Sequence, residues 1–143
     1  MTKNFKMVAK TLFGLEELLA QELRQLGASS IEIGTRNVSF EGDTGFMYKA
    51  NLCCRTAIKI LKPITAFNVF TEEDLYKKIY EMPWENYMDV KGTLAVNATV
   101  FSDVFTHSQY IALKTKDAIV DRFRDREGVR PDVDLDHPTL RIN

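Results

Sequence analysis

The order of apolar patterns over residues 1–65 constrains the fold more than any other feature of this sequence. The patterns predict a strand at residues 5–10, a helix at 14–27, two short strands at 30–34 and 37–42, a helix from about 43 to 54, and a strand at 55–62. The two middle strands are separated by a short link, which predicts an antiparallel hairpin. This succession is that of the split βαβ, or ferredoxin-like, arrangement.

The two helices of this first part carry recognisable end signals. The first has an apolar stripe at helical spacing, and Gly27 stands where a C-terminal cap belongs. Asp43 is expected to cap the second helix, with Phe46, Met47 and Ala50 facing inward. The residues of the first stripe are Leu15, Leu18, Leu19, Leu23 and Leu26.

Residues 66–143 predict a second α+β unit. A helix is expected at residues 71–82, with Thr71 as its N-cap and acidic residues in its first turn. An irregular connection follows, and then a strand at 93–101, a long helix at 106–128, a loop at 129–138 and a strand at 139–143. The predicted fold class is therefore α+β, with domains at 1–65 and 66–143. The sequence stops within the last strand pattern, so we expect that strand to be truncated.

Composition excludes several classes of protein. Hydrophobic residues make up 45% of the 143 residues and charged residues 27%, so a buried core is expected. No apolar run approaches the roughly 20 residues of a membrane span, and the N-terminus lacks the apolar segment of a secretion signal. The only cysteines are the adjacent Cys53 and Cys54, which cannot build a disulfide framework or a zinc site. We therefore expect a cytoplasmic protein without a membrane partner.

Charge and motifs favour a binding module over an enzyme. Residues 1–65 hold nine Lys and Arg against six Asp and Glu, a balance of +3, whereas residues 66–143 hold ten against fourteen, a balance of −4. Nucleic-acid binders usually show a clear basic excess, which this sequence lacks. There is also no glycine-rich cofactor loop, no P-loop and no His/Cys cluster at metal spacing. The two histidines, His107 and His137, have no partners in sequence with which to form a catalytic set.

The helix predicted at residues 106–128 has a core face and a charged face. Ala112, Ile119 and Phe123 share the core face. The opposite face alternates acids and bases, and Lys114 and Asp117 are placed to pair. This face is interpreted either as a solvated, self-neutralised surface or as a surface that binds an anion. Its charged residues are Lys114, Asp117, Asp121 and Arg124.

Three further residues of this helix leave two interpretations open. Lys116 lies near the Phe123 side of the helix, where its amine either reaches out to solvent or stands at the rim of a groove. His107 and Ser108 lie at the N-terminus of the helix, where they serve either as capping residues or as part of a phosphate site.

Two segments resemble a known family. "VAKTLFGLEELLAQELRQLG" is similar to the N-terminal signature, and "HSQYIALKTKDAIVDRFRDREGVRPDVDLDHPTLRIN" to the end of the THUMP domain, of bacterial large-subunit rRNA guanine methyltransferases. The matching signature residues are Gly14, Leu15, Glu16, Leu19, Glu22 and Leu23. Members of that family carry a ferredoxin-like domain, a THUMP domain and a Rossmann-type domain. The last of these uses S-adenosylmethionine to methylate the exocyclic amine of guanine, and such proteins are often called adenine-specific DNA methylases.

The resemblance implies that these 143 residues are an RNA-binding region without catalytic residues, metal or cofactor of their own. The implied partners are large-subunit rRNA and a covalently linked methyltransferase domain that binds S-adenosylmethionine. A THUMP boundary near residue 44 is an alternative to the one at 66. Two other functions remain open: a small-molecule regulatory domain, and the targeting region of a DNA adenine methylase. The candidate RNA contacts are Lys114, Lys116, Ser108, His107 and Arg124, with Lys6, Lys10 and Arg36 in the first unit.

Overall fold

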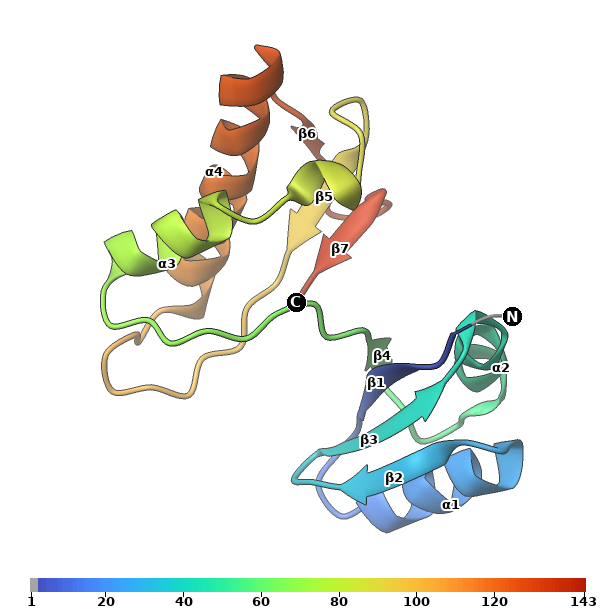
Figure 1. Cartoon of the computed structure of the whole chain (residues 1–143). Coiled ribbons are helices and arrows are strands. Elements are labelled where there is room, and N and C mark those ends of the chain that lie inside the picture. Colours follow the sequence, from blue (N-terminus) through green and yellow to red (C-terminus); the bar gives the residue numbers. More distant parts are fainter. Residues whose placement is uncertain (1–2) are drawn as a thin grey trace. The chain divides into compact units, whose positions relative to one another are not determined.

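The computed structural model describes residues 3–143, and the chain forms two compact units. The first unit runs to Ala66, and the second extends from Phe67 to Asn143 (Figure 1). Each unit has its own hydrophobic core. Within residues 3–143, no helix is both long enough and apolar enough to cross a membrane.

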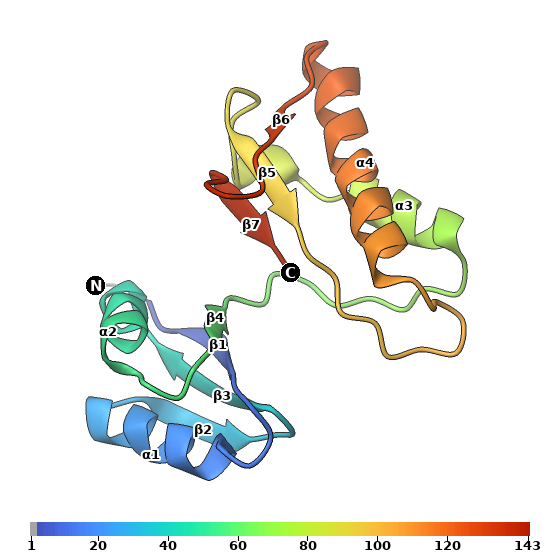
Figure 2. The ribbon, with the colours of Figure 1, turned by 180° about the vertical axis from the view of Figure 1, so that it is seen from behind.

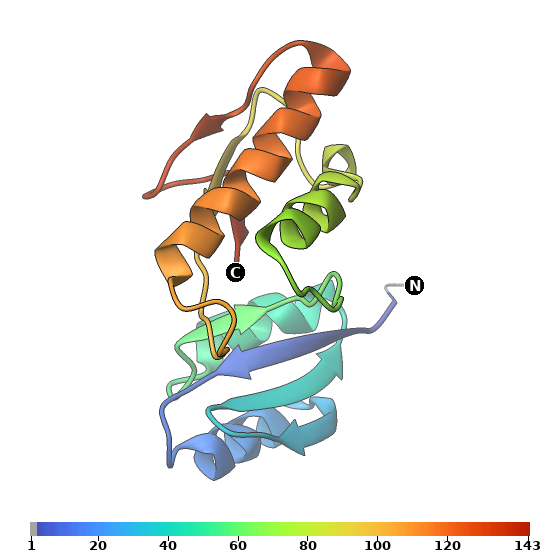
Figure 3. The ribbon, with the colours of Figure 1, turned by 90° about the vertical axis from the view of Figure 1, so that its left-hand side faces the viewer.

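The first unit is a four-stranded antiparallel sheet with two helices, and the predicted ferredoxin-like arrangement is confirmed. The strand order is β2-β3-β1-β4, and every neighbouring pair is antiparallel (Figure 3). The sheet's one buried face carries Met7, Ala9, Val38 and Phe40, which pack against both helices in a single cluster. The elements are β1 Phe5–Lys10, α1 Glu16–Leu26, β2 Ser29–Ile33, β3 Asn37–Gly42, α2 Thr44–Cys53 and β4 Lys59–Leu61.

The end signals of both helices are confirmed. Gly27 caps α1 with a φ of 104°, in the left-handed region that glycine adopts without steric penalty. The Asp43 side chain caps α2 by accepting a hydrogen bond of 2.7 Å from the backbone N–H of Phe46. One residue of the predicted α1 stripe differs: Leu18 is exposed, because the buried arc of the helix is narrow and centred on Leu19 and Leu23.

The strand predicted at residues 55–62 is shorter than expected, since β4 begins at Lys59. The backbone N–H groups of Arg55 and Thr56 donate to the carboxylate of Glu22 instead of joining the sheet. A side chain of α1 therefore takes the place of a neighbouring strand. Hydrophobic alternation along residues 55–62 could not reveal this long-range contact.

The second unit is a three-stranded parallel sheet covered by two helices. The strand order is β6-β5-β7, with β5 in the centre (Figure 2). Leu94 and Ala95 are adjacent in β5 and both buried, as expected for the central strand of a parallel sheet. The elements are α3 Glu72–Tyr80, the short 3-10 helix η1 Trp84–Asn86, β5 Thr93–Val96, α4 Ser108–Glu127, β6 Asp132–Val133 and β7 Leu140–Ile142.

Two strand predictions for this unit were wrong in extent. The strand predicted at 93–101 ends at Val96, and the last ladder bond joins the N–H of Asn97 to the carbonyl of Ile142. Within the described part of the chain, residues 98–101 have no strand beside them, so they form an open loop. β6 lies within the predicted loop at 129–138. It is two residues long, which is too short to show alternation.

The charged face of α4 is not wholly exposed to solvent. Its interpretation as a solvated, self-neutralised surface was therefore wrong around Asp121. α3 packs along this face (Figure 3), and the hydroxyl of Tyr76 donates to Asp121 at 2.5 Å. The hydroxyl of Tyr80 donates to Asp125 at 2.7 Å. Acidic residues on one helix and tyrosines on the other thus form a polar interface, and the periodicity of α4 alone gave no sign of it.

Candidate nucleic-acid interface

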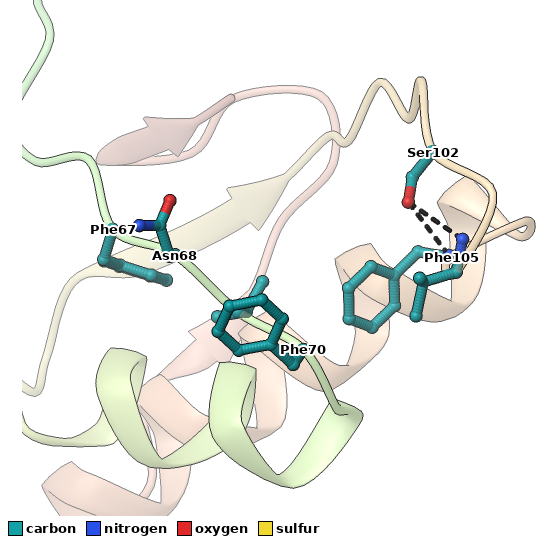
Figure 4. Close-up of a pocket in the computed structure, with 7 residues that line it drawn as sticks. Phe67, Asn68, Phe70, Ser102 and Phe105 are labelled. Atoms are coloured by element: carbon teal, nitrogen blue, oxygen red, sulfur yellow. Dashed lines mark hydrogen bonds between the residues drawn. The ribbon is translucent and has the colours of Figure 1, made fainter.

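Three phenylalanine rings line a pocket in the second unit (Figure 4). Phe67 and Phe70 come from the segment before α3, and Phe105 comes from the loop between β5 and α4. The pocket is open to solvent and has a volume of about 580 Å³. The Phe70 side chain is 75% exposed although it lies beside the pocket. The pocket is lined by Phe67, Asn68, Val69, Phe70, Ser102, Val104 and Phe105.

Both segments that form this pocket are held in place by specific contacts. Val69 packs against the core of the second unit, between the two exposed rings of Phe67 and Phe70. The ammonium group of Lys78 on α3 donates to the carbonyl of Asn68 and lies 5.7 Å from the centre of the Phe67 ring. The pocket is therefore built on an anchored segment, and one cation lies against its aromatic wall.

On the other side of the pocket, a hydroxyl shapes the β5–α4 loop. The Oγ of Ser102 accepts hydrogen bonds from the backbone N–H groups of Val104, at 3.0 Å, and Phe105, at 3.3 Å (Figure 4). This turn brings the Phe105 ring toward the pocket. The same loop leads directly into α4, so the pocket adjoins the N-terminus of that helix.

The N-terminus of α4 lacks the expected side-chain cap. His107 occupies the N-cap position, but its imidazole accepts no hydrogen bond from the first turn, so a capping role for this side chain was wrong. Its carbonyl accepts the first helical bond, from Ile111, at 3.1 Å. Ser108 is the first helical residue and is exposed. A helix that begins in this way leaves its positive end open to an anion.

The three predicted basic contacts on α4 are spread along the helix. The amine of Lys114 lies 5.6 Å from the centre of the Tyr76 ring and is half-buried against α3. Lys116 pairs with Asp117 at 2.6 Å, so the pair predicted between Asp117 and Lys114 was wrong. Arg124 lies about 24 Å along the axis from Ser108, by the rise of an α-helix.

Arg124 is also committed to acidic neighbours. Its guanidinium contacts Asp121 and Asp125, each at 3.3 Å. His107 and Ser108 therefore lie at the end of α4 that the pocket adjoins, Lys114 lies six residues further along the helix, and Arg124 belongs to the other end. The predicted residues of α4 do not converge on one point.

The predicted basic residues of the first unit lie on two parts of it. Lys6 and Lys10 alternate along β1 with the buried Met7 and Ala9, so they lie on the sheet face away from the helices. Arg36 lies in the turn between β2 and β3 with a φ of 59°. Its backbone N–H donates to Glu16 at 3.0 Å, its positive charge acts on the same carboxylate, and the residue is exposed.

Acidic residues also border the pocket, so its electrostatics are mixed. Glu72 accepts a hydrogen bond of 3.1 Å from the Tyr110 hydroxyl, and Glu73 and Asp74 follow it in the first turn of α3. Asp103 lies in the same turn as Ser102. A site with exposed rings and few free cations is better suited to stacking against bases and hydrogen bonding than to binding many phosphates.

Sequence reasoning missed this pocket for a physical reason. Its rings lie in "AFNVF" (66–70) and "VFSDVF" (100–105), which form neither helix nor strand in the structure. Periodicity detects elements, not loops. The available signal is the density of aromatic residues in these two segments, at 66–70 before one predicted helix and at 101–105 before the next.

The described residues do not fit a metal or a nucleotide-type cofactor. Among residues 3–143, no group of three His, Cys, Asp or Glu side chains could hold a metal ion. The β5–α4 connection, residues 97–107, is the strand-to-helix turn where a parallel sheet would bind such a cofactor, and it contains no glycine. The residues at this turn therefore do not fit S-adenosylmethionine.

Together, a ferredoxin-like unit and a parallel three-stranded unit with an open aromatic pocket define a two-unit α+β region. Family models match both units: the RlmL ferredoxin-like domain matches residues 6–61, and the THUMP domain matches residues 70–143. The chain belongs to the THUMP family, in the form that carries an RlmL-type ferredoxin-like domain.

Curated relatives and solved structures agree with this assignment. The chain is 40% identical, over 97% of its length, to ribosomal RNA large subunit methyltransferase K/L of Magnetococcus marinus, and 41% identical over 96% to the protein of that name in Syntrophotalea carbinolica. It spans 19% of the length of each. Among solved structures, SMU.472, a candidate methyltransferase complexed with SAH, matches with a TM-score of 0.77 and 30% identity over 100% of this chain and 37% of that one.

A second solved structure carries a different name. A predicted N6-adenine-specific DNA methylase from Listeria monocytogenes matches with a TM-score of 0.76 and 27% identity, over 87% of this chain and 32% of that one. Relatives of the same fold are thus named for RNA and for DNA methylation.

Proposed function

We propose that this chain is the RNA-binding region of a large-subunit rRNA methyltransferase, which holds structured RNA for a catalytic domain elsewhere in the protein. In this proposal the catalytic domain binds S-adenosylmethionine and methylates the exocyclic amine of a guanine, and the protein is cytoplasmic. The support is the membership of the THUMP family and the rRNA methyltransferase names of relatives that match over nearly the whole chain.

The observation that carries the proposal furthest is the aromatic pocket beside the open N-terminus of α4. Sequence-specific RNA recognition mostly targets unpaired bases, which stack on aromatic side chains. Phe70 and Phe105 offer such surfaces, and the first turn of α4 offers N–H groups to a neighbouring phosphate. We therefore place the RNA contact of the second unit at the pocket, His107 and Ser108, with Lys114 at its border.

Lys6, Lys10 and Arg36 supply a second, more basic contact in the first unit. Their side chains belong to the half of the sequence with a balance of +3. Lysines on an open sheet face suit phosphates of a backbone and not base edges. Lys116 and Arg124 are paired with acids, so we give them a smaller part in binding than the sequence pattern gave them.

The proposal is tested by direct titration of the chain with labelled hairpins from large-subunit rRNA, and with DNA duplexes of the same stem sequence. Saturable binding of a hairpin, tighter than that of the DNA duplex, supports the proposal. Preference for the DNA duplex would instead favour the role suggested by the name of the Listeria relative. Absence of binding to either nucleic acid would overturn it.

A further inference from the structure

The loop between β1 and α1 presents two apolar side chains to solvent. Leu12 is 61% exposed and Phe13 is 75% exposed, and Ile58, which lies beside the end of β1, is 61% exposed. The backbone N–H of Ile58 donates to the carbonyl of Lys10 at 2.7 Å, so the two exposed segments adjoin. We refer to Leu12, Phe13 and Ile58 as the apolar tip.

The loop that carries the tip is fixed by hydrogen bonds on both sides. The backbone N–H of Thr11 donates to the carbonyl of Arg36 at 2.9 Å, and the hydroxyl of the buried Thr11 donates to the carbonyl of Thr56 at 2.6 Å. Gly14 completes the turn with a φ of 93°, which an L side chain rarely adopts. The backbone of the tip therefore has little freedom, although its side chains have no covering.

Two carboxylates of α1 hold the neighbouring segments. Glu16 accepts from the N–H of Gly14 at 2.8 Å and from that of Arg36 at 3.0 Å, and these bonds, with that of Arg36 foremost, lower the pKa of the Glu16 carboxyl. Partial burial raises the pKa of Glu22, but hydrogen bonds from Thr56 and Arg55 outweigh it and lower the pKa overall. Both carboxylates thus stay charged and occupied by backbone donors.

The same end of the sheet gathers basic side chains. Lys10 pairs in register with Lys59 on one side and with Asn37, next to Arg36, on the other. Arg55 is exposed and lies three residues before Ile58. Glu17 lies in the first turn of α1. Basic side chains of Lys10, Arg36, Arg55 and Lys59 therefore lie at this end of the sheet together with the charged carboxylates of Glu16, Glu17 and Glu22.

From this arrangement we infer that the apolar tip is a second RNA contact, at which an unpaired nucleobase stacks on Phe13 while Arg36, Arg55 and Lys10 contact the flanking phosphates. A nucleotide has an apolar base face and an anionic phosphate, which match an exposed ring with basic side chains nearby. A fixed loop loses little conformational entropy on binding, so its rigidity favours this use. The inference rests on the proposed RNA-binding function and adds a base-stacking surface to the contact that Lys10 and Arg36 make in the first unit.

The experiment uses the whole chain and a hairpin RNA with 2-aminopurine in its unpaired loop, alongside a blunt duplex of the same stem. Phe13→Ala is compared with Phe13→Trp and with a control, Leu52→Ala, which removes an 86% exposed side chain from α2 of the same unit. Stacking contributes about 1–3 kcal/mol per base, so Phe13→Ala should weaken hairpin binding roughly 5- to 150-fold. Duplex binding and the slope of affinity against salt should stay unchanged.

The other two variants distinguish a loss of base stacking from unfolding of the chain. Phe13→Trp should bind the hairpin at least as tightly as the unchanged chain, with quenching of the 2-aminopurine fluorescence, and Leu52→Ala should bind normally. If the unchanged chain binds the hairpin but Phe13→Ala binds it equally well, the inference is overturned. If the unchanged chain binds neither RNA, the proposed function fails together with the inference.

Discussion

Arg122 on α4 forms a two-pronged ion pair with Glu85 of η1. Its Nε and one terminal nitrogen each lie 2.8 Å from a carboxylate oxygen, and its other terminal nitrogen donates to the carbonyl of Tyr80 at 2.9 Å. One guanidinium thus joins α4, η1 and the end of α3. Because the planar fork of arginine makes all three bonds at once, no other side chain can replace it here.

Replacing Arg122 should destabilise the second unit. Arg122→Lys keeps the charge but loses the fork, and Arg122→Met keeps most of the volume and loses the charge. Hydrogen bonds to charged groups contribute about 1.5–3 kcal/mol, so we expect each variant to lower the free energy of unfolding by an amount of that order. Urea unfolding measures it. Arg130→Met, which changes an exposed arginine beyond α4, is the control and should stay near the unchanged chain.

The same pair should make stability depend on pH in a defined window. The hydrogen bond from Arg122 lowers the pKa of Glu85 from 4.5 to about 2. A carboxyl whose folded pKa is depressed contributes stability above its unfolded pKa and loses it as pH falls through the folded value. The unfolding free energy of the unchanged chain should therefore exceed that of Glu85→Gln most above pH 4.5, and the difference should shrink toward pH 2. A difference that is constant over this range would show that the ion pair does not contribute.

Truncation of the pocket rings should affect RNA binding more than folding. Phe70 is 75% exposed, and surface substitutions usually change stability by about 0.5 kcal/mol or less. Phe70→Ala should therefore unfold like the unchanged chain but bind an rRNA hairpin more weakly, by roughly 5- to 150-fold if one base stacks there. Leu135→Ala removes a similarly exposed side chain from the same unit and serves as the control. Equal affinity of Phe70→Ala and Leu135→Ala would remove the pocket from the RNA interface.

Lys114 should contribute through its charge. Lys114→Gln keeps the stem that lies beside Tyr76 and removes the positive charge, so a modest loss of affinity and a reduction of the salt slope by about one are expected. Lys91→Gln, in the exposed turn before β5, is the matched control. Isothermal titration at several salt concentrations measures both quantities. An unchanged slope would mean that Lys114 supports the packing of α3 and makes no phosphate contact.

The chain by itself should not bind S-adenosylmethionine. Its strand-to-helix turn at residues 97–107 has no glycine, so side chains keep a nucleotide-type ligand from coming close to the backbone. Calorimetric titration should give no saturable heat. Micromolar binding would show that these residues contain a cofactor site that their sequence does not suggest.

The parts of the fold that were predicted depend on local patterns. The ferredoxin-like unit follows from element order and from caps such as Asp43 and Gly27, whose effects reach only a few residues. What the sequence did not reveal depends on contacts between distant residues. Glu22 shortens β4 by taking its backbone donors, and Tyr76 covers a charged face of α4 that looked solvated. Neither partner can be inferred from spacing along one segment.

The same distinction applies to the candidate interface. The sequence placed His107 and Ser108 at the start of a strongly patterned helix, and the structure has them there. Phe70 and Phe105 were not found, because they are 35 positions apart in irregular segments that only the fold brings together. Lys116 was predicted to contact RNA because of its position and charge, but in the structure its amine pairs with Asp117.

The central claim, that the chain binds RNA through the pocket and the N-terminus of α4, is tested most directly by mapping amide chemical shifts as an rRNA hairpin is added. The account predicts the largest changes of the second unit at residues 67–70 and 102–110, where the pocket and the first turn of α4 lie. Changes concentrated instead on the acidic loop at 132–137, or no changes at saturating RNA, would contradict it.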